Sequence, residues 1–289
     1  MKSPQDFREG TLDRVEIKQT SALLRRVYSH APYLTPAYLK WQYLDNPDGK
    51  AVVFNAWGGN KIVGHIAGVP LTANLEGRPA RGLFLLNAAV DRDYTGRSIV
   101  RVITQDIVET AESQGFDFCI GMGNFLSTKL FLRDFDRIKA FSLVAPLQAR
   151  IGFGTPQRRE SQTRPSFERL WPDDSLRWRL ANPERAYSVS RKDAHMQIIA
   201  PTGKPGIGAL LHHSLPSDSL DQRQTRGTGP LRVWLGLDPD IAWSRSTFVP
   251  IPKRLQPSPL NFVYRAFGGA PKHIDPTRAI FRSLDFDPY

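Results

Sequence analysis

Three strand-like runs in succession constrain the fold of this chain more than any other feature of its sequence. They are rich in apolar and β-branched residues and comprise residues 51–57, 61–75 and 80–90. Turns that contain glycine, at residues 58–60 and 76–77, separate the runs. Short turns of this kind connect antiparallel neighbours. The sequence therefore predicts an antiparallel meander of three strands.

Helical patterns lie on both sides of this meander. Apolar residues recur at helical spacing within residues 18–30, and residues 35–46 open with Thr35 as a candidate N-cap. Ile99, Ile103 and Ile107 then form one apolar stripe. The later elements are a strand at 116–124, a short helix at 127–135 and a strand at 140–151. This order predicts an α/β (α+β) fold in which a mixed, mostly antiparallel twisted sheet is flanked by helices.

A local pattern occurs twice along the chain. In "YLKWQYLDNP" and "SLRWRLANP", a leucine is followed two residues later by Trp41 or Trp178, and an Asn-Pro pair follows within five residues. Each copy then enters a strand-like run. The repeat favours duplication of a domain of about 140 residues, an ordinary domain size. We expect a first domain at residues 1–151, a polar linker at 152–170 and a second half at 171–289.

The charge and composition of the chain limit the classes of partner that it is expected to bind. The formal net charge is +11, but it is spread along the chain, without a run of five basic residues or a recognisable nucleic-acid-binding motif. We therefore expect a mild attraction for anionic ligands and no nucleic-acid partner. No apolar run approaches the ~20 residues of a membrane span, and "MKSPQDFREG" lacks the apolar stretch of a signal peptide. We expect no membrane span, a cytoplasmic location and a buried structural thiol at the single cysteine, Cys119.

The stretch "VDRDYTGRSIVRVI" carries positive charge where a helix begins. Arg97 and Arg101 lie around the expected first turn, and Arg92 is close in sequence. A cation in the first turn opposes the helix dipole by roughly 0.3–1 kcal/mol. An anion bound between the arginines would offset this cost. The alternative is that the arginines are solvated or paired with Asp91 and Asp93.

This stretch resembles the signature of the GNAT acyltransferases, which move an acyl group from a CoA thioester to an amine. In that family, a turn of the form Arg/Gln-x-x-Gly-x-Gly/Ala follows the fourth strand and opens a long helix. Val90 and Tyr94 match in position, whereas Thr95, Ser98 and Val100 depart from the pattern. The element order and the repeated Trp/Asn-Pro pattern also look like the tandem-domain members. The second half has no counterpart of the turn, so the resemblance implies a degenerate GNAT-like half without its own cofactor site.

The resemblance implies acetyl-CoA or another acyl-CoA as co-substrate, and no metal. The pyrophosphate would lie at the start of the helix, and the strand backbone before it would bind the pantetheine and polarise the thioester carbonyl. Asn124 would hold the pantetheine amide. The residues assigned to cofactor binding are Ala89, Val90, Gly96, Arg97, Ser98, Ile99, Arg101 and Asn124.

The resemblance also points to catalytic candidates. The position of the usual family acid, a tyrosine, is Phe131 here. Ser127, one helical turn earlier, is assigned to the departing thiolate, with a helix N-cap as the alternative. His65 is the candidate base for the incoming ammonium group, and a satisfied core histidine is the alternative.

Two residues are assigned to the amine acceptor. Asn87 lies in the strand where a family base is often found, but its amide cannot act as one. Trp41 could line the acceptor cleft, or it could simply pack its helix onto the sheet.

These observations lead to one hypothesis and two alternatives. The hypothesis is an N-acyltransferase that moves an acyl group from acyl-CoA directly to the amine of a small molecule or amino sugar, without a covalent enzyme intermediate. One alternative is a binding protein that kept the fold and lost catalysis. The other is a Fem-type transferase that uses an aminoacyl-tRNA.

Overall fold

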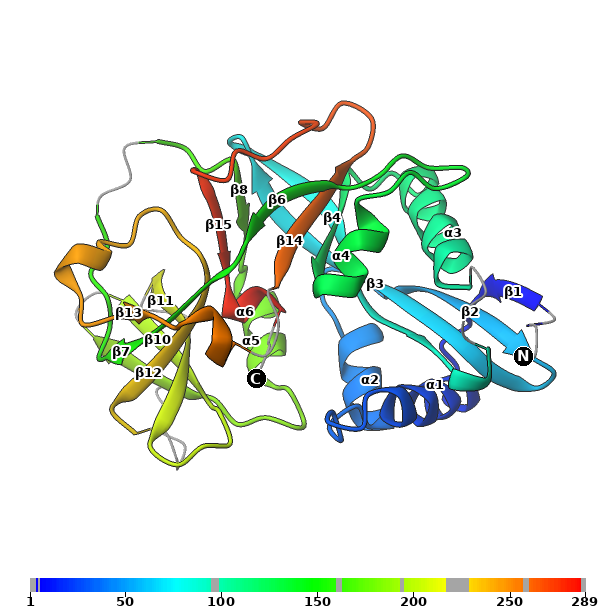
Figure 1. Ribbon diagram of the computed structural model, residues 1–289, viewed down its shortest axis with the longest axis horizontal. Coiled ribbons are helices and arrows are strands. Elements are labelled where there is room, and N and C mark those ends of the chain that lie inside the picture. Colours follow the sequence, from blue (N-terminus) through cyan, green and yellow to red (C-terminus); the bar gives the residue numbers. More distant parts are fainter. Residues whose placement is uncertain are drawn as a thin grey trace. The chain divides into compact units, whose positions relative to one another are not determined.

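The structure is a computed structural model of the 289-residue chain, and it describes residues 4, 6–94, 99–159, 163–192, 195–216, 229–256 and 260–286 (Figure 1). The chain divides into two compact units. Unit 1 comprises Met1–Thr72, Ala80–Leu143 and Val263–His273, and unit 2 comprises Ala73–Pro79, Val144–Phe262 and Ile274–Tyr289. Each unit thus combines segments that are distant in sequence, and the continuous boundaries suggested by the sequence stay a prediction.

Unit 1 holds the meander and most of the helices. Its helices are α1 (Arg14–Val27), α2 (Pro36–Tyr43), α3 (Ile99–Ser113) and α4 (Phe125–Phe131), with a short 3-10 helix η1 (Arg92–Tyr94). Its strands are β1 (Asp6–Glu9), β2 (Val52–Gly58), the larger parts of β3 (Lys61–Leu75), β4 (Arg78–Val90) and β14 (Asn261–Ala266), β5 (Phe118–Gly123) and the first residues of β6 (Ser142–Pro146). The sheet order is β1-β2-β3-β4-β5-β14, antiparallel between β1, β2 and β3 and parallel between β4 and β5. The mixed, mostly antiparallel sheet flanked by helices that the sequence predicts is confirmed.

The helix boundaries of unit 1 follow local chemistry. Asp13 caps α1 by accepting hydrogen bonds from the backbone N–H groups of Val15 and Glu16. Thr35 caps α2 through its hydroxyl, which accepts from the backbone N–H of Tyr38, and Pro36 occupies the first helical position, as the sequence predicts. After α3 the chain turns at Gly115 with φ +75°, a conformation that glycine adopts without strain.

The core of unit 1 lies between α3 and the sheet. Ile99, Ile103 and Ile107 are at most 1% exposed and pack with apolar side chains of β2, β3 and β4. Cys119 on β5 is fully buried in the same cluster, and burial raises the pKa of its thiol. This confirms the stripe and the buried thiol that the sequence predicts.

Unit 2 is built mainly from strands. They are β7 (Gln148–Phe153), β8 (Phe167–Arg169), β9 (Ser188–Lys192), β10 (His195–Pro201), β11 (Ile207–Pro216), β12 (Leu231–Leu237), β13 (Val249–Pro250) and β15 (Ala279–Arg282). The helical elements are α5 (Asp173–Leu180), α6 (Ser283–Phe286) and the 3-10 helices η2 (Trp243–Arg245) and η3 (Lys253–Leu255). The order is β8-β15-β12-β11-β10-β9, with β7 against β12 and β13 against β7. Strand β8 lies within the segment that the sequence suggested as a linker.

The repeated Asn-Pro pattern forms the same local structure in both units. Asn46 follows α2, and its side-chain oxygen accepts the backbone N–H of Asp48. Asn182 follows α5, and its side-chain oxygen accepts the backbone N–H of Glu184. Both side chains are 5% exposed. A buried asparagine therefore turns the chain out of the helix and toward the next strand in each unit.

Of the helices within the described ranges, none is both long enough and apolar enough to cross a membrane.

Candidate functional site

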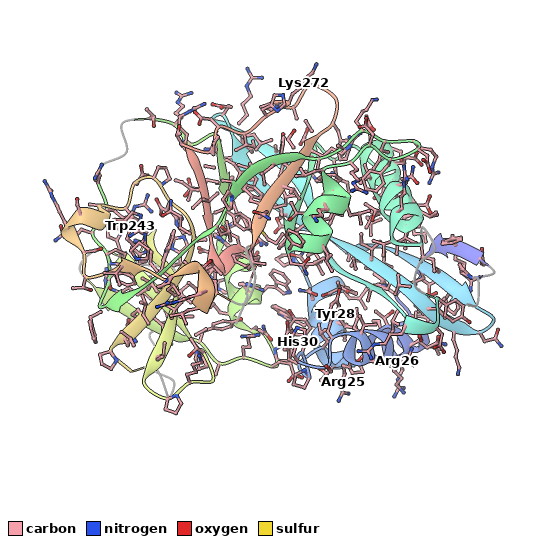
Figure 2. All side chains as sticks on the ribbon, in the orientation of Figure 1. Arg25, Arg26, Tyr28, His30, Trp243 and Lys272 are labelled. Atoms are coloured by element: carbon pink, nitrogen blue, oxygen red, sulfur yellow. The ribbon has the colours of Figure 1, made fainter. Side chains whose placement is uncertain are left out.

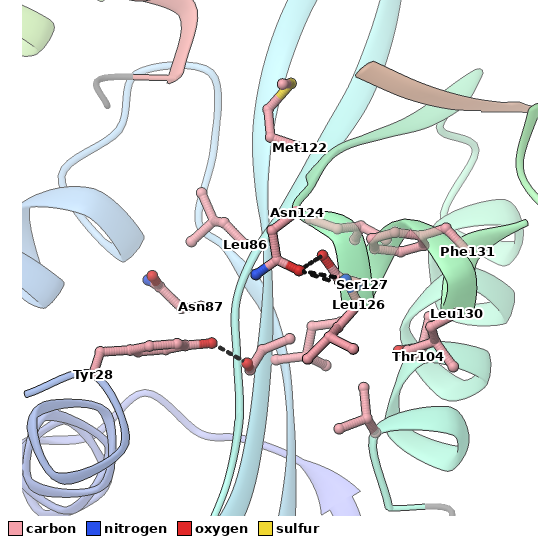
Figure 3. A pocket seen from close by; sticks show the side chains of 14 residues that line it. Tyr28, Leu86, Asn87, Thr104, Met122, Asn124, Leu126, Ser127, Leu130 and Phe131 are labelled. Carbon is pink, nitrogen blue, oxygen red and sulfur yellow. Dashed lines mark hydrogen bonds between the residues drawn. The ribbon is translucent and has the colours of Figure 1, made fainter. Parts of the chain in front are cut away.

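A cavity of about 390 Å³ opens in unit 1 where β4 and β5 diverge. The two strands pair in parallel from Gly82–Phe118 to Leu85–Gly121, and the residues that follow on each strand line the cavity. The lining residues are Tyr28, Ile66, Leu85, Leu86, Asn87, Ala88, Val100, Thr104, Met122, Asn124, Leu126, Ser127, Leu130 and Phe131 (Figure 3). Most of the lining is apolar, and the polar groups lie at a few separate points.

Strand β4 changes course at Asn87. This residue has φ +56°, a left-handed conformation that is uncommon for a residue with a side chain and most readily adopted by asparagine among them. Regular strand residues alternate between the two faces of a sheet. Here four consecutive residues, 85–88, line the cavity. The irregular backbone at Asn87 thus brings this stretch of β4 to the site.

Asn124 connects β5 to α4 at the opposite wall. Its side-chain oxygen accepts hydrogen bonds from the backbone N–H groups of Leu126 and Ser127 and from the hydroxyl of Ser127, at 3.0–3.1 Å. The amide nitrogen points away from α4 toward β4 (Figure 3). Asn124 is therefore the N-cap of α4, and its amide presents a hydrogen-bond donor to the cavity.

Ser127 and Phe131 lie one helical turn apart on α4, and both line the cavity. The N-cap role suggested as the alternative for Ser127 belongs to Asn124. The aromatic ring of Phe131 is buried and packs against Phe141 with a centroid distance of 4.8 Å. The placement of Ser127 beside the cavity agrees with its assignment, which stays a prediction.

In the sequence, Tyr28 is only one of the apolar positions of a helical pattern, and nothing there indicates a role at the site. Tyr28 caps the C-terminus of α1 (Figure 2), and its hydroxyl donates to the backbone carbonyl of Ala88 (Figure 3). Burial raises the pKa of this hydroxyl. Tyr28 is the one ionisable side chain among the described residues that line the cavity.

Two residues of α3 also reach the cavity. Val100 stands where the GNAT signature has glycine or alanine, and it lies in the wall of the cavity without filling it. Thr104, one turn later, is 1% exposed, and within the described part of the chain its hydroxyl has no hydrogen-bond partner. A buried polar atom without a partner is costly unless a ligand or water satisfies it. Thr104 is therefore a buried hydroxyl beside the cavity whose hydrogen-bonding capacity is unused within the described residues.

His65 does not occupy the position expected for a base. It is 1% exposed, and its ring nitrogens face the hydroxyl of Tyr43 at 3.1 Å and the side-chain oxygen of Asn55 at 2.7 Å. Burial lowers the pKa of His65 to about 3, so the imidazole is neutral at physiological pH. The alternative from the sequence, a satisfied core histidine, describes this environment, and a direct contact with an incoming amine does not fit it.

The two residues assigned to the acceptor differ in position. Trp41 is 5% exposed and packs against Tyr38, with ring centroids 5.3 Å apart, so it does not line the cavity. Asn87 does line it, and its amide nitrogen donates to Gln42 Oε1 at 3.0 Å and to the hydroxyl of Tyr43 at 2.7 Å. The structure therefore brings Asn87 to the site and leaves Trp41 in the packing of α2.

The residues assigned to cofactor binding also differ in where they lie. Gly96, Arg97 and Ser98 lie outside the described residues. Arg101 forms an ion pair with Asp136 at 2.7 Å and donates to the backbone carbonyl of Asp134, so its partner is an acidic loop rather than Asp91 or Asp93.

The apolar residues of this group take different positions. Ile99 and Ala89 are buried, and Val90 is half-buried against the same core. These three residues can therefore meet a ligand chiefly through their backbone groups.

No group of three or more His, Cys, Asp or Glu side chains among the described residues is arranged to hold a metal ion. The candidate site residues that the sequence does not signal are Tyr28, Gln42, Tyr43 and Thr104. Tyr28 ends α1, Gln42 and Tyr43 lie in α2, and Thr104 lies in α3, so packing of the helices accounts for these positions in the sequence. The hydrogen bonds of Tyr28, Gln42 and Tyr43 reach β3 and β4, and no short-range pattern in the sequence predicts these contacts.

The comparisons with known proteins agree on one fold. Residues 17–135 match the Acetyltransferase (GNAT) family. No curated protein sequence matches the chain. Among solved structures, N-myristoyltransferase of Saccharomyces cerevisiae with bound myristoyl-CoA has a TM-score of 0.60 and 11% sequence identity, over 97% of this chain and 85% of that chain.

Two further structures have similar scores. A GCN5-related N-acetyltransferase from Anabaena variabilis has a TM-score of 0.58 and 11% identity, and Eis1 from Mycobacterium abscessus has a TM-score of 0.57 and 10% identity. Each comparison covers 90% of this chain and 73% of the other. At these identities the likeness concerns the fold. Residues 17–135 are therefore similar to the acetyltransferase domain of the GNAT family, and the chain shares its fold with solved N-acyltransferases.

Proposed function

We propose that this protein is an acyl-CoA-dependent N-acyltransferase that transfers an acyl group directly to the amine of a small molecule or amino sugar in the cytoplasm. The observation that carries the proposal is the cavity between the diverging ends of β4 and β5, inside the region that matches the GNAT family. It combines a largely apolar lining with a donor from Asn124 and a buried, unpartnered hydroxyl at Thr104 among the described residues. Apolar walls with a few fixed polar groups suit a pantetheine arm and its thioester.

In this proposal the chain contributes positioning more than acid–base chemistry. The backbone of β4 at Ala89 and Val90 would hold the thioester carbonyl, and Asn124 would hold the pantetheine amide. The amine nitrogen attacks the carbonyl carbon, a C–N bond forms, and the C–S bond breaks to release CoA thiolate. The proton lost by the amine ends on the thiolate or on solvent, with Ser127 beside the leaving sulfur. Because Tyr28 is the one ionisable group of the described lining, the amine would enter in its neutral form.

One observation favours the alternative of a binding protein that has lost catalysis. Phe131 stands where the GNAT resemblance places a tyrosine, and its ring has no proton to donate. This alternative keeps acyl-CoA binding and loses turnover. Binding and turnover must therefore be measured separately.

The test combines ligand-induced stabilisation with a transfer assay. Thermal unfolding is followed with CoA, acetyl-CoA, longer acyl-CoAs and tRNA, and free thiol release is followed with acetyl-CoA and glucosamine or benzylamine. A ligand at 100 times its Kd stabilises the folded state by about 2.7 kcal/mol, which is a measurable shift in Tm. We expect stabilisation by acyl-CoA and thiol release that depends on the amine.

A cavity-filling substitution locates the effect. Met122→Trp places a larger side chain in the cavity and should abolish stabilisation by acyl-CoA, whereas Val249→Trp, at an exposed position of β13 in unit 2, should leave it intact. Stabilisation by acyl-CoA without thiol release would favour the binding protein. Salt-sensitive tRNA binding without any response to CoA would favour the aminoacyl-tRNA-dependent transferase. No response to any CoA compound would refute acyl-CoA use.

A further inference from the structure

A chain of buried hydrogen bonds leads from the cavity wall into the sheet. It begins at Asn87 on β4, whose amide nitrogen donates to Tyr43 Oη at 2.7 Å. Tyr43 Oη faces His65 Nε2 on β3 at 3.1 Å, and His65 Nδ1 faces Asn55 Oδ1 on β2 at 2.7 Å. Asn55 and His65 are direct cross-strand neighbours, and Tyr43, His65 and Asn55 are each 1% exposed.

In this buried hydrogen-bond chain, the donor and acceptor of each bond can be assigned. Asn55 Oδ1 can only accept, so we assign the imidazole proton to Nδ1 of His65. Nε2 of the neutral ring must then accept, and the hydroxyl of Tyr43 donates to it. The oxygen of Tyr43 remains an acceptor for the amide of Asn87, which agrees with the observed contact. A protonated His65 would carry a second donor at Nε2 and leave the Tyr43 hydroxyl between two donors.

The second hydrogen of the Asn87 amide is held in the same way. It donates to Gln42 Oε1 at 3.0 Å, and Gln42 Nε2 in turn donates to the hydroxyl of Tyr38 at 3.2 Å. Both hydrogens of Asn87 Nδ2 are thus used inside the protein. The polar atom that Asn87 retains for a molecule in the cavity is its oxygen, Oδ1, which can only accept.

We infer that Gln42, Tyr43 and His65 are positioning residues that fix the amide of Asn87, so that its oxygen accepts a hydrogen bond from the N–H of the amine acceptor. This inference rests on the proposed function and assigns His65 a role at a distance. A fixed acceptor selects molecules with an N–H at the reacting atom. An amide oxygen also carries no full charge, so it stabilises an ammonium group far less than a carboxylate would and leaves the amine its reactive neutral form.

Variants at His65 test whether the buried hydrogen-bond chain holds the amide of Asn87 in place. His65→Leu removes the acceptor for the Tyr43 hydroxyl, which then competes for Asn87 Oδ1 and allows the amide to turn. His65→Gln keeps a side-chain oxygen that can accept from Tyr43. With acetyl-CoA and the faster of glucosamine and benzylamine, we expect His65→Leu to raise KM for the amine about tenfold, equivalent to ~1.4 kcal/mol, with kcat and acetyl-CoA affinity within about twofold. His65→Gln should restore KM to within about twofold of the parent value.

A second measurement is independent of catalysis. In protein labelled with ¹⁵N-asparagine, the side-chain amide of Asn87 is assigned by its loss in Asn87→Asp. We expect its two protons to exchange slowly with solvent in the parent and in His65→Gln, and faster by at least tenfold in His65→Leu. If the parent turns over no amine, the proposed function fails while the exchange data still decide whether the buried chain holds Asn87.

A matched control separates positioning from loss of stability. Asn46→Ala removes another buried polar side chain of unit 1, one that donates to the backbone carbonyl of Pro70 and, within the described residues, forms no hydrogen bond with Asn55, His65, Tyr43 or Asn87. It should lower Tm without changing KM or the exchange of Asn87. Tyr43→Phe serves if His65→Leu does not fold, and it should reproduce both effects. Equal KM values and equal Asn87 exchange in the parent, His65→Leu and Tyr43→Phe would overturn the inference.

Discussion

The two units bury polar side chains in different ways. In unit 1 the chain Asn55–His65–Tyr43–Asn87 consists of neutral groups, and one end reaches a cavity. In unit 2 one buried cluster consists of charged groups that bind one another. Asp238, whose side chain is 0% exposed, pairs with Arg282 at 2.9 Å, and Arg282 also contacts Glu168 at 3.3 Å.

The difference concerns what each set of contacts can present to a ligand. A buried charge must be compensated by its neighbours, so the carboxylate of Asp238 is held by the guanidinium groups of Arg282 and Arg158. Neutral groups can form a series of hydrogen bonds in which each group donates to the next, and such a series leaves one defined polar atom free at its end. Unit 1 leaves such an atom, Asn87 Oδ1, at the cavity. The charged contacts of unit 2 are consistent with a role in specifying its fold.

The largest effect should follow from breaking the charged contacts. Asp238→Ala leaves the buried guanidinium of Arg282 without its main counter-charge, and loss of one partner of a buried ion pair costs about 3–5 kcal/mol. Urea unfolding of the parent and the variant measures the change. Glu168→Gln is the control, because Glu168 is 30% exposed and its loss should cost less than about 1 kcal/mol. Similar losses in both variants would contradict the central place given to Asp238.

Breaking the neutral chain should cost less. Tyr43→Phe leaves the side chain volume nearly unchanged but removes the hydroxyl between Asn87 and His65. Two buried groups then lack a partner, and the free energy of unfolding should fall by about 1–3 kcal/mol. The same urea titration measures it. A loss as large as that of Asp238→Ala would remove the distinction between the two units.

Acidification should destabilise both units through their buried histidines. Burial lowers the pKa of His65 in unit 1 and of His213 in unit 2 to about 3, below the ~6.5 of an unfolded chain. As pH falls below about 6.5 the unfolded state takes up the proton first, so the stability contributed at neutral pH is lost toward pH 3, by ~1.4 kcal/mol per pH unit for each such histidine. His65→Gln and His213→Gln should each reduce the slope of stability against pH between pH 6.5 and 5 by about one proton. A slope equal to that of the parent would show that the substituted histidine is already charged or exposed.

Local features of both units could be read from the sequence because their causes are local. The start of α2 at Thr35 and Pro36 follows from a hydroxyl cap and a fixed φ, and the buried face of α3 follows from spacing alone. The Asn-Pro pattern was recognised for the same reason, since each asparagine bonds to the backbone two residues later. Chemistry confined to a few neighbouring residues leaves a signature in the sequence.

The candidate site was only partly predictable because its contacts join distant segments. Asn87 lies in an apolar run, and nothing in "LFLLNAAV" signals a left-handed residue that bends the strand. Histidine often acts as a general base, so the sequence makes His65 a candidate. Only the packing of β2, β3 and α2 around it shows that it is buried and neutral. Residues 263–273 join unit 1 although the sequence places them far inside the second half. Tertiary contacts of this kind decide which polar residues meet a ligand and which do not.

The smallest effects should come from the surface of the two repeated helices. Lys40 and Arg177 each precede the repeated tryptophan and form an ion pair at the surface. The ammonium of Lys40 binds both oxygens of Asp45 at 2.6 and 2.7 Å, and Arg177 lies 3.3 Å from Asp174. Both basic side chains are 60% exposed.

Because water and salt screen exposed pairs, Lys40→Ala and Arg177→Ala should each lower the free energy of unfolding by no more than about 1 kcal/mol, and added salt should remove most of the difference. Urea unfolding at low and high salt measures both values. If the helices are structural equivalents, the two losses should agree within about 0.5 kcal/mol, which is the usual precision of additive surface effects. A salt-independent loss above about 1.5 kcal/mol at one position would mean that its alkyl stem packs against the unit. In that case the surface that carries Lys40 in α2 and the surface that carries Arg177 in α5 would have different roles despite the repeated sequence.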